Sequence, residues 1–416
     1  MSAFQSRNGV LHVESVSLAD ISARFGTPCW VYSRQALETA LDEFQHELVG
    51  LDALVCYAVK ANSNLAVLDV LARRGAGFDI VSAGELKRVL AAGADPQRIV
   101  FSGVGKTAAE MELALTTGIL CFNVESVPEL ERLNALAGRL GKTAPVSLRV
   151  NPDVDAGTHP YISTGLKENK FGVAYDEARA LYRQAAGLTH LEVSGIDCHI
   201  GSQLLDAAPF AEALDKLLLL VDQLADDGIV LQHIDLGGGL GIRYSDADRP
   251  TSVHSYLQPL LERLKGRQLR ILLEPGRRLV GNAGLLLTRV EYLKPGEVKN
   301  FAIVDAAMND LSRPALYGSW HDIVPVAAHE GSARKWEIVG PICESGDWLA
   351  RDRALALHAG DLLALTEAGA YGMAMSSNYN SRARAAEIMI DGEQAWVIRE
   401  RESFAHQIAG EHCLPR

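Results

Sequence analysis

Short β-rich runs alternate eight times with longer stretches of helical spacing between residues 54 and 277. This repeated order of strand and helix predicts parallel strands joined by crossover connections. Eight such units match a (β/α)8 TIM-like barrel, which usually takes about 250 residues, and the count favours this closed barrel over the alternative, a doubly wound open sheet. The eight runs are LVCYAVK (54–60), GFDIVS (77–82), IVFSG (99–103), ILCFNVES (119–126), VSLRVNP (146–152), VSGIDCHIGS (193–202), LQHIDLGGG (231–239) and LRILLEPGR (269–277).

The sequence pattern changes after about residue 280. Apolar and polar residues alternate there, in segments separated by Gly, Pro and Asp-Gly. This pattern predicts a mostly antiparallel sheet. Two short candidates, GVLHVES and PCWVYS, precede the barrel and could join this sheet. We therefore expect a barrel domain over residues 32–280 and a β-sheet domain made of residues 1–31 and 281–416.

Composition disfavours several classes of partner and location. The formal net charge of −12 argues against nucleic acid or an anionic membrane as a partner. The N-terminus lacks the apolar core of a signal peptide, and no apolar run reaches the roughly 18 residues that cross a bilayer. The six cysteines lie far apart without a C-x-x-C pair, so we expect neither a metal site nor a disulfide framework. A reducing, cytoplasmic location fits this cysteine usage.

Lys60 ends the first β-rich run, and the C-terminal ends of barrel strands are where catalytic groups collect. Side chains alternate along a strand, so Cys56, Ala58 and Lys60 share one face, whose small members fit the barrel interior. Lys60 would then point into the barrel mouth, where desolvation lowers the pKa of an amine and makes it a nucleophile toward carbonyls. Taken alone, a lysine here is more simply a solvated strand end.

Glycine-containing turns follow the seventh and eighth runs. Gly237–Gly239 fail the dinucleotide fingerprint, because Ile242 stands where its last glycine belongs. Clustered glycines still let backbone N–H groups approach a phosphate, and the 274–277 segment, EPGR, adds Arg277 at the usual phosphate position of such barrels. A tight turn without a ligand is an equally good interpretation of the glycine run alone.

A nucleophilic lysine, a phosphate cradle, a histidine and a carboxylate at one barrel mouth together predict pyridoxal 5'-phosphate as the cofactor. Lys60 would hold the cofactor aldehyde as a Schiff base. Glu274 would keep the pyridine nitrogen protonated, and His199 would stack on the ring. For His199 alone, a core histidine bonded to the backbone is the simpler interpretation.

Seven motifs give the chain a resemblance to a known family. In sequence order they are YAVKAN, FDIVSAGEL, HIGSQ, GGGLGI, EPGR, CESGD and GAYG, and they span residues 57 to 372. The set resembles the fold-type III pyridoxal-phosphate decarboxylases, and among them the diaminopimelate decarboxylase family. The resemblance implies an alanine racemase-like architecture, with a barrel followed by a β-sheet domain.

The resemblance also implies roles for individual residues. Lys60, His199, Glu274 and Cys343 form the catalytic set, with Cys343 as the acid that reprotonates the substrate α-carbon with help from Lys60. The cofactor-binding set is Lys60, Asp79, His199, Ser202, Gly238, Gly239, Glu274, Gly276, Arg277 and Tyr371. The substrate-binding set is Arg277, Arg313, Tyr317, Glu344 and Tyr371.

The substrate implied by the resemblance is meso-2,6-diaminopimelate, which a carboxy-lyase of this family converts to L-lysine and CO2 in the last step of lysine biosynthesis. Arg277, Arg313 and Tyr317 would hold the distal carboxylate, since the planar fork of arginine binds carboxylates bidentately. Glu344 would pair with the distal ammonium. A decarboxylase for ornithine, arginine or carboxynorspermidine is the alternative, although ornithine-type enzymes carry Cys-Asp where this chain has Cys343-Glu344.

The resemblance further implies a homodimer in which the Cys343 loop reaches the partner's barrel. Two other interpretations remain open. An alanine racemase would share the barrel but needs a tyrosine base in place of the Cys343 motif. A non-catalytic carrier of pyridoxal phosphate predicts the loss of Lys60 or Cys343, and both are present.

Overall fold

The structure is a computed structural model that describes residues 4–154, 170–329 and 331–416. The chain divides into two compact units, which we call the barrel unit and the sheet unit. The barrel unit comprises Glu38–Ile242 and Asp248–Leu279, and the sheet unit comprises Met1–Leu37, Arg243–Ala247 and Val280–Arg416.

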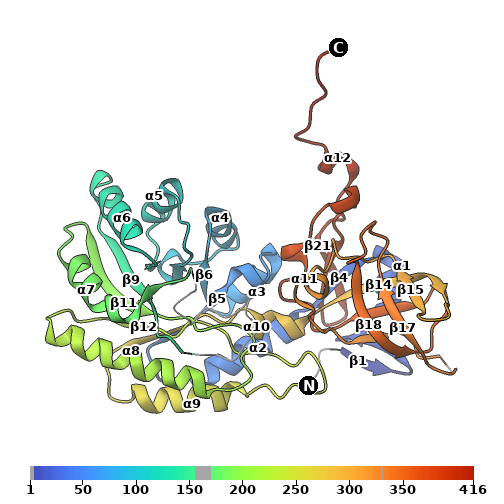
Figure 1. Ribbon diagram of the computed structural model, residues 1–416, viewed down its shortest axis with the longest axis horizontal. Helices are drawn as coiled ribbons and strands as arrows, with labels where there is room; N and C mark the ends of the chain where they lie inside the picture. The colour runs from blue at the N-terminus through green and yellow to red at the C-terminus, as the bar shows by residue number, and fades with distance from the viewer. Residues whose placement is uncertain (1–3, 155–169, 330) are drawn as a thin grey trace. The chain divides into compact units, whose positions relative to one another are not determined.

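Eight parallel strands close into a ring in the barrel unit, which confirms the predicted barrel. Neighbours pair in the order β9, β11, β12, β13, β5, β6, β7 and β8, and β8 pairs back with β9 to complete the ring. Each of the eight β-rich runs overlaps one of these strands, of which Figure 1 labels β5, β6, β9, β11 and β12. The strands are β5 (Ala53–Ala58), β6 (Gly77–Ile80), β7 (Ile99–Phe101), β8 (Cys121–Val124), β9 (Ala144–Asn151), β11 (Leu191–Asp197), β12 (His233–Asp235) and β13 (Arg270–Leu273). The two-residue β10 (Val173–Ala174) pairs with β9 alone.

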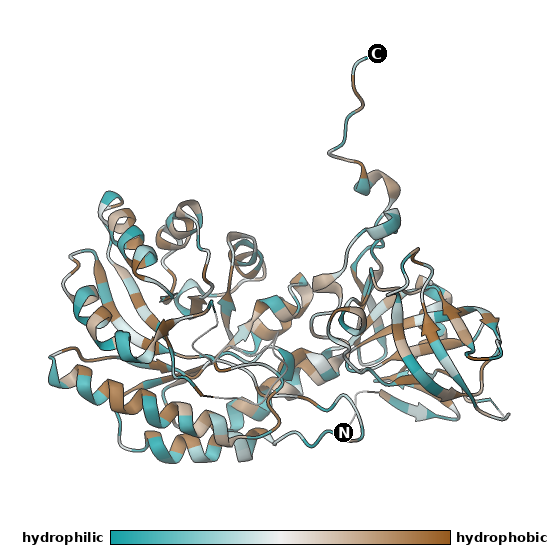
Figure 2. Ribbon diagram, in the orientation of Figure 1, coloured by the Kyte–Doolittle hydropathy of each residue, from teal (hydrophilic) through white to brown (hydrophobic). Residues whose placement is uncertain are grey.

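Helices connect successive strands, and short polar side chains cap most of their N-termini. Ser82 and Ser126 accept backbone N–H bonds at the starts of α4 and α6, and Thr107 forms a capping box with Glu110 at α5. Hydrophobic and hydrophilic residues alternate along α8, as expected for a helix with one buried face (Figure 2). The helices are α2 (Arg34–Glu47), α3 (Leu65–Arg73), α4 (Ala83–Ala91), α5 (Ala108–Thr117), α6 (Val127–Arg139), α7 (Tyr175–Ala186), α8 (Ala208–Asp226), α9 (Val253–Leu264) and α10 (Arg277–Val280).

A small apolar layer fills the barrel interior. Leu54 and Cys56 of β5 pack there with Val100, Cys121 and Leu272 from three other strands, and all five side chains are buried. The predicted inward face of the first run is therefore correct for Cys56. Burying each such aliphatic side chain contributes about 1.5–3 kcal/mol, and this layer supports the polar residues that follow at the strand ends.

The sheet unit is mostly antiparallel, as predicted. One sheet has the order β18, β17, β15, β14, β4, β20 and β21, with β19 joining β14 to β16, and only the pairs β15–β17 and β20–β4 are parallel. Its strands are β4 (Cys29–Ser33), β14 (Gly284–Lys294), β15 (Phe301–Val304), β16 (Ile323–Pro325), β17 (Arg334–Val339), β18 (Trp348–Leu355), β19 (Leu362–Leu365), β20 (Ala386–Asp391) and β21 (Gln394–Arg399). A second sheet contains β1 (Phe4–Arg7), β2 (Val10–Val13) and β3 (Val16–Ser17).

Both short candidates near the N-terminus form strands, but they join different sheets. The PCWVYS run forms β4 of the large sheet, whereas the GVLHVES run forms β2 of the small one. One core cluster joins the two sheets, with Val13, Val31, Leu287 and Ile388 fully buried in it. The helices of this unit are α1 (Leu18–Phe25), α11 (Arg313–Tyr317) and α12 (Phe404–Gln407). No helix among the described residues is long and apolar enough to span a membrane.

Candidate active site

Lys60 lies just after β5, in a single 3-10 turn formed by Val59–Ala61. The sequence placed it on the strand itself, and this detail is wrong because β5 ends at Ala58, whose N–H bonds to the Pro275 carbonyl. The Lys60 Nζ is 3.0 Å from Asp79 Oδ2, at the end of the neighbouring β6. The lysine side chain is 40% exposed and the aspartate side chain is buried. The structure thus gives an ion-paired, accessible amine instead of the expected desolvated one.

His199 follows β11 and accepts a hydrogen bond at Nδ1 from the backbone N–H of Gly238, over a distance of 3.1 Å. Burial lowers the pKa of His199 well below its usual value, and the positive charges of Arg149 and Lys60 lower it further. The imidazole is therefore neutral, with its proton on Nε2. A neutral, oriented ring of this kind suits stacking on an aromatic cofactor, although its backbone bond also matches the simpler interpretation.

Glu274 lies at the end of β13 and is 6% exposed. Its Oε1 is 3.3 Å from Asn123 Nδ2 and 3.4 Å from Ser102 Oγ, so the ends of β7, β8 and β13 meet at this carboxyl group. Ser147 of β9 in turn donates to Asn123 Oδ1 at 2.8 Å. Burial raises the pKa of Glu274 well above its usual value, and Asp235 and Asp79 raise it further.

Two buried aspartates beside Glu274 were missed by the sequence analysis. Asp197 and Asp235 end β11 and β12, and their carboxylate oxygens lie within 4.8 Å of one another and of Glu274. Burial raises the pKa of Asp235 to about 6 and that of Asp197 well above its usual value. A buried Asp two positions before His199 or Gly237, in an otherwise apolar run, was the available signal. Burial and mutual repulsion therefore favour the protonated form of these carboxyl groups.

Backbone approaches closely at the glycine turns, where side chains would not fit. A Cβ on Gly238 would lie 2.1 Å from the Glu274 carbonyl oxygen, and one on Gly239 would lie 2.4 Å from that of Gly201. Beside them, Arg277 donates to Ser202 Oγ at 3.0 Å while remaining only 7% exposed. Glycine backbone, a hydroxyl and a guanidinium form a donor set that fits a phosphate group.

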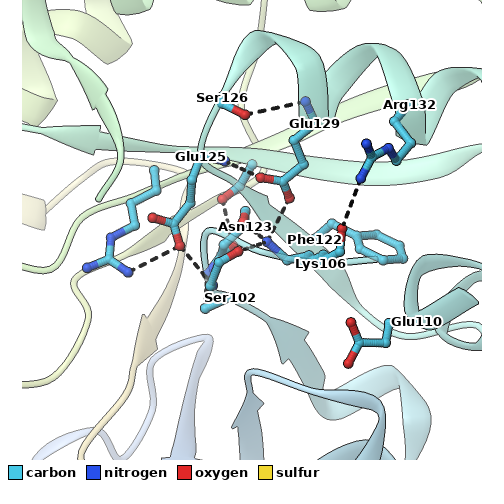
Figure 3. Close-up of polar contacts among 12 residues, drawn as sticks. Ser102, Lys106, Glu110, Phe122, Asn123, Glu125, Ser126, Glu129 and Arg132 are labelled. Carbon is cyan, nitrogen blue, oxygen red and sulfur yellow. Dashed lines mark hydrogen bonds and ion pairs between the residues drawn. The ribbon is translucent and has the colours of Figure 1, made fainter. Parts of the chain in front are cut away.

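A buried ion network lies at the ends of β7 and β8 (Figure 3). Lys106 Nζ is 2.7 Å from Glu129 Oε1 and also donates to the carbonyls of Asn123 and Gly103. Glu129 accepts from the N–H of Glu125. Both side chains of the Lys106–Glu129 pair are almost fully buried.

The network continues from Glu125 toward the carboxyl cluster. The Glu125 carboxylate accepts from the N–H groups of Gly103 and Gly172 and lies 3.4 Å from Arg149 Nη1. Burial, the largest single influence, lowers the pKa of Arg149, but the negative charges of Glu125, Asp197, Glu274 and Asp79 together outweigh burial, so the pKa is raised. Arg149 is thus a fixed positive charge that offsets the carboxyl cluster.

Comparison with known proteins identifies the family of this chain. Residues 34–281 match the pyridoxal-dependent decarboxylase, pyridoxal binding domain family. A diaminopimelate decarboxylase of Pseudomonas aeruginosa is 60% identical over 416 residues, which is 100% of each chain. This chain belongs to the diaminopimelate decarboxylase family. Its family membership confirms the resemblance inferred from the motifs.

Solved structures of the family share the architecture of this chain. The Helicobacter pylori diaminopimelate decarboxylase complexed with L-lysine has a TM-score of 0.91 and 43% identity, covering 94% of this chain and 98% of that one. The M. jannaschii enzyme in co-complex with L-lysine has a TM-score of 0.94 and 36% identity, covering 100% and 99%.

Five residues that the family resemblance implicates belong to the sheet unit. Arg313 is buried near the start of α11, where its Nη1 lies 3.0 Å from His321 Nε2 and its guanidinium lies 4.7 Å from the centre of the Tyr244 ring. Tyr317 is four residues further along the same short helix, so it shares a face with Arg313. Tyr371, after β19, has a φ of 57°, the left-handed region.

Cys343 and Glu344 lie on the loop between β17 and β18, and both are exposed. Asp347 fixes this loop by accepting from the N–H groups of Met308 and Ile342. Asn380 accepts from the N–H of Cys343 at 2.9 Å. In contrast, Cys29, Cys56, Cys121 and Cys198 are buried. In this diaminopimelate decarboxylase-family chain, Cys343 is therefore an accessible thiol on a braced loop.

Proposed function

We propose that this chain is a diaminopimelate decarboxylase that converts meso-2,6-diaminopimelate to L-lysine and CO2 with pyridoxal phosphate, in the cytoplasm. The observation that carries this proposal is the 60% identity, over the full length of both chains, to a protein of that name. The lysine complexes of two structural relatives support it, because lysine is the expected product.

The cofactor-binding role is assigned to the barrel unit, within the domain limits of 32–280 predicted from the sequence. Lys60 would hold the cofactor aldehyde through its amine, which is accessible and lies beside Asp79. The close backbone at Gly238, Gly239 and Gly276, with Ser202 and Arg277, would hold the phosphate. Tyr371 joins this set on the strength of the resemblance.

Pyridoxal phosphate, when bound, supplies a protonated pyridine ring that accepts the electron pair left behind when a carboxylate departs as CO2. Glu274, as a carboxylate, would accept the N–H of the protonated ring, and the positive charge of the ring would offset the burial that raises the pKa of this carboxyl group in the cofactor-free chain. The neutral imidazole of His199 would cover one ring face without placing a positive charge beside it.

Substrate selection is assigned to the residues that would hold the two groups at the end of diaminopimelate that does not react. Arg277, Arg313 and Tyr317 would hold the distal carboxylate, and Glu344 would hold the distal ammonium. A substrate that lacks the distal carboxylate would leave the buried guanidinium groups of Arg277 and Arg313 without that ligand, which costs about 1–3 kcal/mol or more for a charged group. The Cys343 thiol would deliver the proton to the substrate α-carbon after CO2 leaves.

We also propose that the enzyme acts as a homodimer in which each Cys343 loop serves the partner's barrel. The exposure of Cys343 and Glu344 in the single chain supports this proposal. Mixing Lys60→Ala and Cys343→Ala proteins, each inactive alone, tests it. Partial recovery of activity on mixing is expected, whereas two inactive proteins that form mixed dimers without recovery would contradict shared sites.

The deciding experiment supplies purified protein with pyridoxal phosphate and meso-diaminopimelate and measures L-lysine, with L-ornithine, L-arginine and carboxynorspermidine in parallel. Lysine from diaminopimelate alone is expected. Turnover of one of the other substrates instead would overturn the assignment of the distal residues. A Lys60→Ala variant that decarboxylates at the wild-type rate would refute the role of Lys60.

A further inference from the structure

We propose that His329, His358 and Asp361 form a binding site for a divalent metal ion of the zinc type in the sheet unit. This inference concerns a cluster that takes no part in the decarboxylation described above. It therefore stands or falls independently of the proposed function.

The three side chains come together from two connections of the sheet unit. His329 lies between β16 and β17, and His358 and Asp361 lie in the turn between β18 and β19. The Nε2 of His329 is 2.7 Å from Asp361 Oδ1, and the Nδ1 of His358 is 4.0 Å from Asp361 Oδ2. One ligand atom from each residue falls within 4.8 Å of the other two. The cluster is thus small enough for one ion to touch all three.

Asp361 is held in place by its own backbone and by that of its neighbours. Its carbonyl accepts from the N–H of Val290 in β14 at 2.8 Å, and Gly360 donates to the Val290 carbonyl at 2.7 Å. Its carboxylate Oδ2 accepts from the N–H of His358 at 2.7 Å. Only 11% of the side chain is exposed. This carboxylate is therefore a fixed ligand around which the two imidazoles gather.

The two imidazole rings already stand at an angle suited to a shared ion. Their centres are 4.8 Å apart and their planes are inclined by 83°, so the rings meet edge to face instead of stacking. A tetrahedral zinc ion has metal–ligand bonds of about 2.0–2.2 Å, which puts its ligand atoms roughly 3.3 Å apart. The observed spacings of 2.7 and 4.0 Å lie on either side of that value.

Ion binding needs only a small movement of exposed side chains. The side chain of His358 is 67% exposed, so its ring can turn toward Asp361 without disturbing the core. The ion would replace the proton that His329 Nε2 and Asp361 Oδ1 share in their hydrogen bond, and that proton would leave to solvent. Water would complete the coordination, because the site opens to the surface.

The donor set selects the kind of ion. Two imidazole nitrogens and one carboxylate oxygen suit zinc, nickel, copper or cobalt, whereas magnesium and calcium prefer oxygen ligands alone. The guanidinium of Arg289 donates to the carbonyl of the neighbouring Gly360. The carboxylate oxygens of Asp361 lie beside the two imidazoles.

The test compares zinc binding by the full-length, cofactor-loaded protein without an affinity tag. Equilibrium dialysis against graded Zn²⁺, with bound metal measured by atomic absorption, is performed on wild type and on His329→Ala/His358→Ala. We expect the wild type to bind one more equivalent per chain than the double variant. Each single change, including Asp361→Asn, should weaken that site by about tenfold or more, since even outer-shell changes cost 10–100-fold.

The matched control is His254→Ala, which removes an exposed histidine whose Nδ1 lies 2.9 Å from Glu47 Oε2. This control should bind the same amount of zinc as the wild type. Zinc should also raise the thermal midpoint of the wild type and the control more than that of the double variant. Equal zinc binding by the wild type and the double variant would overturn the proposal, because exposed thiols and the cofactor are common to both.

Discussion

The Lys60 ammonium lies 3.0 Å from a carboxylate oxygen of Asp79, in a pair whose basic member is exposed and whose acidic member is buried. An opposite charge at this distance favours the charged form of an amine. The nucleophile toward an aldehyde is the neutral amine. Asp79 therefore holds the Lys60 side chain in position, and we expect it to slow the proposed attack of the Lys60 amine on the cofactor aldehyde.

The Asp79→Asn change should speed the capture of pyridoxal phosphate by cofactor-free protein at neutral pH by about tenfold, because the amine loses its stabilising charge. The change in cofactor absorbance after rapid mixing measures this rate. Asp69→Asn is the control, since it removes the carboxylate of an exposed pair with Arg73. Slower capture by Asp79→Asn would show that the carboxylate chiefly orients the amine.

The Asp235→Asn change should flatten the pH dependence of stability in cofactor-free protein. Burial raises the pKa of Asp235 from 3.8 to about 6 in the folded state. The folded chain thus holds this proton more tightly than the unfolded chain does. Stability contributed by the proton is complete below pH 4 and is lost as the pH rises through about 6, by an amount on the order of 2–3 kcal/mol.

Urea unfolding between pH 4 and pH 8 measures this effect for the wild type, Asp235→Asn and the control Glu262→Gln, which changes an exposed residue of α9. The wild type and the control should lose stability over this range, and Asp235→Asn should lose less. Parallel curves for all three proteins would contradict the assigned proton.

The Arg313→Lys change should lower kcat/KM for diaminopimelate by about 10²-fold, equivalent to roughly 3 kcal/mol, while the fold is kept. Lysine retains the charge but lacks the planar fork that pairs with a carboxylate. Arg351→Lys is the control, because it alters an exposed guanidinium 4.5 Å from the Trp348 ring in the same unit. Steady-state kinetics measure the effect, and an unchanged kcat/KM in Arg313→Lys would remove Arg313 from the substrate site.

The Lys106→Met change should destabilise the protein by about 3–5 kcal/mol, because it leaves the buried carboxylate of Glu129 without its partner. Figure 3 shows the ammonium among its acceptors, with Glu129 and Asn123 on either side. Adding Glu129→Gln should recover part of this loss, since no buried charge then remains. Lys142→Met, at an exposed position, is the control. Thermal and urea unfolding measure all four proteins, and equal stability of Lys106→Met and the control would contradict the prediction.

Much of this fold follows from local pattern alone. Each of the eight barrel strands was predicted, because a buried parallel strand appears in the sequence as a short β-rich run between two stretches of helical spacing. Strand ends were less predictable. Lys60 lies in a 3-10 turn that follows Ala58, the last residue of β5, and Ala58 bonds to Pro275, a residue far away in the chain.

Sequence motifs indicated some residues of the candidate site. Residues whose role depends on being close in space to others were missed. His199 and Glu274 stand in motifs that pointed to their chemistry. Asp197 and Asp235 gain their importance from one another, because two buried carboxylates within 4.8 Å of Glu274 change its protonation. Spacing along a chain does not reveal which strands become neighbours across a barrel.

The pairing of β5 with β13 determines how late in translation the barrel can close. Ala53 of β5 pairs with Ile271 of β13, so the ring cannot close until more than two hundred further residues have been made. At about 5–20 residues per second, the edge of β5 waits roughly 10–40 s for its partner on the ribosome. An unpaired edge invites association with other chains during that interval. The closed ring that protects the finished enzyme therefore makes the nascent chain depend on whatever shields β5 in the cell.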